Sequence, residues 1–164
     1  MRRDGVDAIT EQWATVRPDL DTATMALFGR VYRLADQMGE QMTRLFGSYG
    51  ISRGEFDVLA TLRRSGSPYR LTPGDLASSL MVTSGGMTGR LDKLAAAGLV
   101  ERIPHPTDKR HVLVQLTGEG VELVDAAVTA QTKAQRYVLE ALGRDRVEDL
   151  SNRLRELLDI VARP

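Results

Sequence analysis

The residues best suited to chemistry lie between Leu71 and Leu116, and their types suit the binding of a polyanion. Hydroxyl side chains gather where a helix is expected to begin, at Thr83, Ser84 and Thr88. At a helix N-terminus such groups can donate hydrogen bonds to phosphate or to the edges of bases. Cationic side chains follow at Lys93, Lys109 and Arg110. This combination points to nucleic acid as the ligand.

Arg110 lies in an expected exposed loop, residues 104–111, that two prolines stiffen. Asp108 can orient its guanidinium through a bidentate pair. We therefore predict that Arg110 enters a minor groove, where narrow A·T tracts attract a guanidinium, and that Lys109 contacts phosphate. The alternative is a solvated hairpin tip.

Local signals predict the elements that would position these side chains. Thr72 is a capping residue that Pro73 follows at the first helical position, with Asp75 three residues after the cap. Thr83 or Ser84 caps a second helix that Gly98 ends. Two strands are expected at 100–103 and 112–116. Helix, turn, helix and a basic-tipped hairpin make a winged helix-turn-helix, which places one helix in a major groove and the loop near a minor groove.

Helices flank this module on both sides. We expect them at 7–16, at 21–46, after a capping box at Ser52–Glu55, at 117–142, and beyond Gly143. The helix after the capping box should bury Phe56, Leu59 and Leu62. The last helix carries an apolar stripe at Val147, Leu150, Leu154, Leu157 and Val161.

The fold predicted from these elements is mainly α with a small β-hairpin. A winged helix-turn-helix lobe, residues 49–116, stands on a helical dimerisation platform made of residues 1–48 and 117–164. The flanking helices are too long for so small a core to cover, so a two-fold partner is the expected use of their apolar faces.

Composition excludes several classes of protein. The chain has 164 residues, no cysteine and a formal net charge of zero, so disulfides and thiolate metal sites are ruled out. Residues 61–111 nevertheless hold eight basic and four acidic side chains, a local charge of +4, and DNA binding responds to local fields. No run of about 18 apolar residues and no secretory signal is present, so we expect a cytoplasmic protein without a membrane partner.

From about Asp21 to Val161 the chain resembles the MarR family of bacterial transcriptional regulators. The residues that carry the resemblance are Glu55–Leu59, Leu71–Ala77, Met87–Thr88 with Leu91, Asp92 and Leu94, Gly98–Arg102, Asp108–Arg110 and Val114–Thr117. It implies a dimer whose terminal helices interlock, with a ligand crevice between that platform and each DNA-binding lobe. One departure is Gly89, at a position where the family resemblance implies a basic residue in many relatives. Gly85 and Gly86 allow either close approach to phosphate or a mobile helix start.

A narrower resemblance concerns the effector. Trp13, Asp57, Arg90 and Arg102 together look like the urate-responsive branch of this family. In that branch the tryptophan lies beside a purine-like anion that an arginine holds, and the anion pushes the acid away. The alternatives are a phenolic or other aromatic acid as effector, core packing of Trp13, and a purely structural Arg90–Asp57 salt bridge. Asp92 could pair with an arginine of the same lobe.

These observations predict a ligand-responsive transcriptional regulator that acts as a repressor and binds a pseudo-palindromic operator in double-stranded DNA as a homodimer. A small aromatic or purine-like anion such as urate would release it. The competing classes are an enzyme and a winged helix used only to bind proteins. No phosphate-binding loop, nucleophile elbow or paired metal ligands are visible, so we expect no catalytic residue, cofactor or metal.

Overall fold

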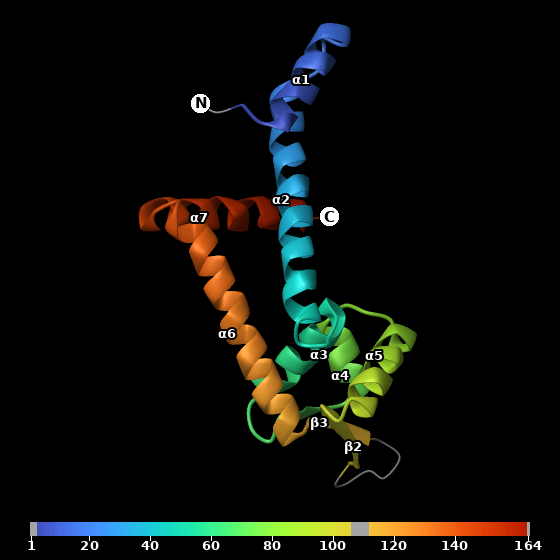
Figure 1. Cartoon of the computed structure of the whole chain (residues 1–164). Coiled ribbons are helices and arrows are strands. Elements are labelled where there is room, and N and C mark those ends of the chain that lie inside the picture. The colour runs from blue at the N-terminus through green and yellow to red at the C-terminus, as the bar shows by residue number, and fades with distance from the viewer. Residues whose placement is uncertain (1–2, 106–111, 164) are drawn as a thin grey trace. The chain divides into compact units, whose positions relative to one another are not determined.

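The computed structural model describes residues 3–105 and 112–163. The chain forms two compact units, residues 1–44 and residues 45–164. Ten helices and strands are assigned in the described residues (Figure 1). The expectation of a mainly helical protein with a small antiparallel sheet is confirmed.

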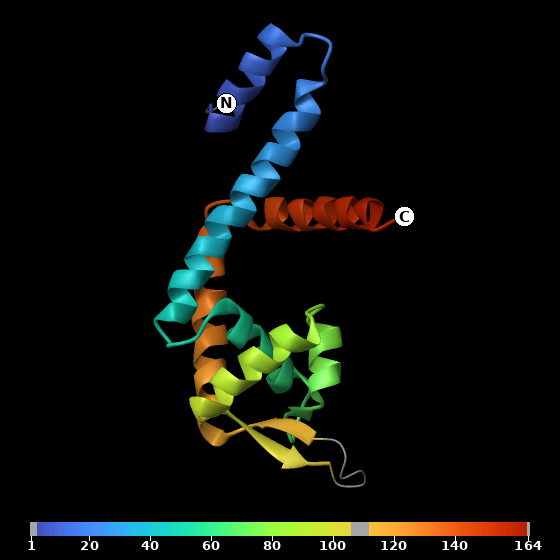
Figure 2. The ribbon, with the colours of Figure 1, turned by 90° about the vertical axis from the view of Figure 1, so that its right-hand side faces the viewer.

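The first unit consists of one helix and most of a second, whose last three residues belong to the second unit. α1 (Gly5–Val16) and α2 (Thr22–Gly47) agree with the helices predicted at 7–16 and 21–46, and α1 folds back beside the start of α2 (Figure 2). Asp4 caps α1 and forms a capping box with Asp7. Val6 is the buried apolar residue of α1.

The second unit holds the main core, built from three helices. α3 (Arg53–Arg64) begins at the predicted capping box of Ser52 and Glu55. α4 (Pro73–Ser79) begins at the predicted box of Thr72 and Asp75, and α5 (Ser84–Ala96) follows. Side chains of these helices that are fully or almost fully buried include Phe56, Leu59, Leu62, Leu76, Met87, Leu91 and Leu94. The three residues predicted to form the core face of α3 are among them.

A three-stranded antiparallel sheet closes this core, in the order β1-β3-β2. β2 (Val100–Pro104) and β3 (Val112–Leu116) form the predicted hairpin, with Val100 opposite Leu116 and Pro104 opposite Val112. β1 (Arg70–Leu71) was not predicted. It pairs with β3 through Arg70 opposite Gln115 and Leu71 opposite Val114, and two residues are too few to show an alternating pattern.

The last two helices are α6 (Gly118–Glu140) and α7 (Arg144–Val161), and Gly143 with φ +83° separates them as predicted. Arg63 of α3 holds α6 through a bidentate pair with Asp125, at 2.9 and 3.0 Å. Beyond Ala127, neither α6 nor α7 has a buried residue within the part of the chain that the structure describes. None of the described helices is long and apolar enough to cross a bilayer.

The start of α6 docks closely on the start of β2. Thr117 caps α6, and its hydroxyl donates to the Gly98 carbonyl at 2.7 Å while accepting from the Gly120 amide at 3.0 Å. The Thr117 amide donates to the Leu99 carbonyl at 3.2 Å. A Cβ built on Gly120 would overlap that same Leu99 carbonyl oxygen, whereas one built on Gly118 meets open space. Gly120 is thus required by this close approach of two backbones.

We predict that Gly120→Ala lowers the free energy of unfolding by about 1–3 kcal/mol, because the methyl group must push α6 away from β2. Gly118→Ala is the matched control two residues earlier in the same helix turn. It should be neutral or stabilise by up to about 1 kcal/mol, because alanine favours helix and nothing obstructs it. Urea unfolding followed by circular dichroism measures both, and equal midpoints for the two variants would contradict the close approach.

Candidate nucleic-acid interface

The orientation of α5 follows from which of its residues are apolar. Met87, Leu91 and Leu94 are each 1% exposed, and their spacing of three and four places them on one side of the helix. The opposite side is open: Cβ atoms built on Gly85 or Gly89 would touch no other group. α5 therefore packs on the lobe along one face and presents the other to solvent.

The hydroxyl residues predicted for nucleic-acid contact lie at the start of this helix. Thr83 is the N-cap, and its hydroxyl accepts from the Gly86 amide at 3.3 Å, so the capping role is confirmed for Thr83. Ser84 is the first helical residue, and its carbonyl accepts from the Thr88 hydroxyl at 3.0 Å. All three side chains are exposed, as is Lys93 in the last turn. The DNA contacts predicted for these four residues stay predictions.

Lys109, Arg110 and Asp108 lie outside the described residues. What the structure does show is the base of their loop. β2 ends at Pro104 and β3 begins at Val112, directly opposite each other in an antiparallel pair. The described residues therefore include two paired antiparallel strands that follow the helix-turn-helix.

Arg102 is engaged by an acid of α5. Its Nη2 lies 2.6 Å from Oδ1 of Asp92, and both side chains are about half exposed. This confirms that Asp92 pairs with an arginine of the same lobe. The bridge joins β2 to the second half of α5, and any anion that binds Arg102 has to compete with a carboxylate already in place.

Arg90 does not pair with Asp57, so the interpretation of these two residues as a salt bridge is wrong. The Arg90 guanidinium instead lies against Gly54 in the first turn of α3, where a Cβ would come within 2.8 Å of Cζ. The absence of a side chain at Gly54 makes this space. Asp57, half-buried almost a full turn further along α3, is not the group that Arg90 meets.

A hollow of about 400 Å³ lies between the first turn of α3 and the side of α5. Its lining residues are Ser52, Gly54, Glu55, Gly85, Gly86, Gly89, Arg90 and Lys93. Two cations and one acid line it, so an anion is the better-matched occupant by charge. Of the four residues predicted to bind an effector, Arg90 alone lines this hollow, and Trp13 belongs to the other unit, 41% exposed.

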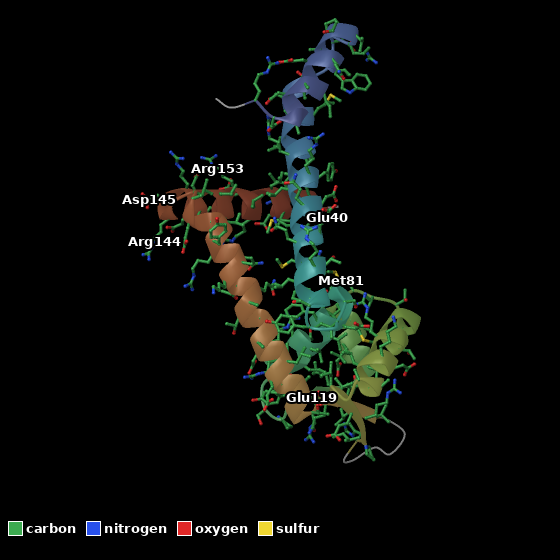
Figure 3. All side chains as sticks on the ribbon, in the orientation of Figure 1. Glu40, Met81, Glu119, Arg144, Asp145 and Arg153 are labelled. Carbon is green, nitrogen blue, oxygen red and sulfur yellow. The ribbon has the colours of Figure 1, made fainter. Side chains whose placement is uncertain are left out.

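Sequence reasoning missed one unusual residue next to α5. This residue is Met81, labelled in Figure 3, in the turn between α4 and α5. Its side chain is 92% exposed and its backbone has φ +51°. This left-handed conformation favours glycine or asparagine, and a methionine there gives no signal in the sequence. Gly54 was also missed, because its contact with Arg90 depends on how two helices pack.

A helix-turn-helix followed at once by an antiparallel hairpin, with the second helix open to solvent, is the architecture of a winged helix-turn-helix transcriptional regulator. Residues 49–111 match the model of the MarR family. Over 153 residues the chain is 37% identical to the HTH-type transcriptional regulator PecS of Dickeya dadantii (strain 3937), an alignment that covers 93% of this chain and 90% of that protein. The chain belongs to the MarR family.

Solved structures support the same assignment. A mutant of MarR from E. coli complexed with operator DNA has a TM-score of 0.68 and 27% identity, over 89% of this chain and 97% of that one. NadR in complex with 4-hydroxyphenylacetate has a TM-score of 0.61 and 26% identity, over 77% and 88%. The chain is therefore a transcriptional regulator and not an enzyme.

Proposed function

We propose that this chain binds a pseudo-palindromic operator as a homodimer, represses transcription there, and leaves the DNA when a small aromatic or purine-like anion binds. The observation that carries the proposal is the open face of α5 directly before the β2–β3 hairpin. The likeness of this chain to a MarR structure that contains operator DNA supports the proposal. Residues 49–116 would form the DNA-binding lobe, and residues 1–48 and 117–164 the dimerisation platform.

In this proposal α5 occupies the major groove. Ser84 and Thr88 donate hydrogen bonds to phosphate or to base edges. Thr83 caps α5 beside the DNA backbone, and Lys93 contacts phosphate. Arg110, oriented by Asp108, enters the adjacent minor groove, and Lys109 binds phosphate. The exposure of the N-cap Thr83 and of the three α5 residues is consistent with these roles.

We predict that Arg110→Ala weakens operator binding by about 1–3 kcal/mol, because a guanidinium is lost from the minor groove. Lys133→Ala, which removes an exposed charge from α6, is the matched control and should leave affinity unchanged. Fluorescence anisotropy with labelled operator at matched salt measures both. A wild-type affinity that does not fall with salt would instead favour a protein-interaction module.

The dimer is proposed from apolar surface that one chain leaves uncovered. Along α7, Leu150 and Leu154 are each 41% exposed, Leu158 is 68% exposed and Val161 is 67% exposed. A groove of about 1180 Å³ lies between α6 and α7, and its lining is mainly polar and charged, with Leu139 and Val147 as its large apolar residues. We assign a helix of the second copy to the exposed apolar residues of α7, because large apolar side chains gathered on one exposed helix mark a protein interface.

We predict that the chain is dimeric at micromolar concentration by sedimentation velocity. Deleting residues 147–164 should give an aggregating or unfolded product, because the apolar side of α6 then loses its partner. A truncated chain that stays soluble, folded and monomeric would show that the platform needs no second copy.

The effector is proposed to be an anion bound near Arg90. Arg90 and Lys93 line the hollow between α3 and α5, and the resemblance to urate-responsive relatives adds Trp13, Asp57 and Arg102. Since Arg90 faces Gly54 rather than Asp57, the anion would not need to break an Arg90–Asp57 pair. It would compete with Asp92 for Arg102, repel Asp57, and so favour a pose of α5 that no longer matches operator spacing.

We predict that urate quenches Trp13 fluorescence and weakens operator binding. A tenfold loss of DNA affinity requires about 1.4 kcal/mol of preference for the released pose. Trp13→Phe should abolish the optical signal, and Arg102→Ala should reduce the response of DNA affinity to urate, while Lys133→Ala retains both. If 4-hydroxyphenylacetate produces these changes and urate does not, the purine assignment is wrong and a phenolic acid takes its place.

A further inference from the structure

A cluster of three charged side chains joins the two helices of the first unit. Arg30 of α2 contacts two acids at the start of α1: its Nε lies 2.8 Å from Oδ2 of Asp4 and its Nη2 lies 2.6 Å from Oδ1 of Asp7. One guanidinium thus bridges both members of the α1 capping box. A planar fork with several N–H donors is suited to this arrangement, and the single ammonium of lysine is not.

The apolar contact between the two helices lies at the same end of α1. Val6 is 4% exposed, and a Cβ on Gly29 would come within 3.1 Å of its Cγ1, so the two helices approach closely there. The guanidinium of Arg33 lies over Gly5. Further along α1 the apolar side chains are open, with Ile9 43% exposed and Val16 67% exposed. The side-chain contacts that hold α1 on α2 are therefore concentrated at the first turn of α1.

Trp13 lies on the same helix as that attachment. It stands seven residues after Val6, which puts both on the same side of α1, and about 10 Å further along the helix axis. At its other end α1 is joined to α2 by the short connection of residues 17–21. Loss of the attachment at Arg30 would let α1 turn about that connection and carry the Trp13 ring with it.

The attachment is present at neutral pH. The hydrogen bond from Arg30, with that from the Val6 amide, lowers the pKa of Asp4 to about 2. The pKa of Asp7 is lowered as well, first by the Asp4 amide and then by Arg30. A carboxylate with a depressed pKa contributes its full stabilisation above the ordinary value near 4 and loses it as the pH falls toward 2. Since the pairs are partly exposed, salt rather than physiological pH would weaken them.

We propose that Arg30 is a positioning residue: by bridging Asp4 and Asp7 it docks α1 on α2 and sets the place of Trp13 for contact with the effector. Arg30 touches no effector itself. The second half of this statement rests on the proposed function, whereas the docking of Trp13 does not.

The test uses the whole chain and its single tryptophan. Arg30→Gln removes the bridge to Asp4 and Asp7. Arg30→Lys keeps the positive charge but lacks the planar guanidinium. Arg44→Gln is the matched control. Arg44 is a second arginine of α2, and its ion pair with Glu40 stays within that helix. Acrylamide quenching and the emission maximum of Trp13 are measured first without effector. Operator affinity is then measured with and without urate or 4-hydroxyphenylacetate.

We expect Arg30→Gln to raise the quenching constant of Trp13 and shift its emission to the red, and to weaken the response of DNA affinity to effector. Operator affinity without effector should be unchanged, Arg30→Lys should be intermediate, and Arg44→Gln should match the wild type. Unchanged quenching in Arg30→Gln would overturn the docking role. Altered quenching with an unchanged effector response would overturn the positioning role. If neither urate nor 4-hydroxyphenylacetate changes the operator affinity of the wild-type chain, the effector part of the proposed function is refuted. The quenching of Trp13 would then still test whether Arg30 docks α1 on α2.

Discussion

Burial of one side of α5 is the constraint on which the interface depends. The side chains of Met87, Leu91 and Leu94 are buried on one side of α5, in the core formed with α3, α4 and the sheet. Each such side chain contributes about 1.5–3 kcal/mol on burial. That preference exceeds what any single exposed polar group on α5 could contribute. The open side of the helix, with its glycines, Thr88 and Lys93, faces outward as a consequence of packing.

The rest of the lobe holds this packing in place from several directions. The Arg63–Asp125 pair joins α3 to α6, the Arg102–Asp92 pair joins β2 to α5, and the close approach at Gly120 joins α6 to β2. Two of these links are partly exposed ion pairs, which are each worth little in isolation. Their effect is to set the angles between elements whose apolar contacts already hold them together.

The helix boundaries could be predicted because their signals are local. Ser52, Thr72 and Thr83 cap the helices of the lobe as expected, since a capping side chain bonds an amide within three residues of itself. β1 could not be predicted, because its pairing with β3 joins residues far apart in the chain. The pair of Asp92 with an arginine was foreseen by charge alone, whereas the contact of Arg90 with Gly54 was not. A glycine has no side chain whose charge or polarity could indicate a contact. The space beside Gly54 exists only once the two helices have packed.

The central claim is that this chain reads a specific DNA sequence as a dimer. Footprinting of the DNA upstream of its own gene, with unrelated DNA of equal length as competitor at fixed salt, tests that claim most directly. The account predicts two protected half-sites about 10 base pairs apart, centre to centre, or a multiple of that spacing. Protection should survive an excess of competitor. Protection that competitor removes in proportion to its mass, with no pair of half-sites, would contradict it.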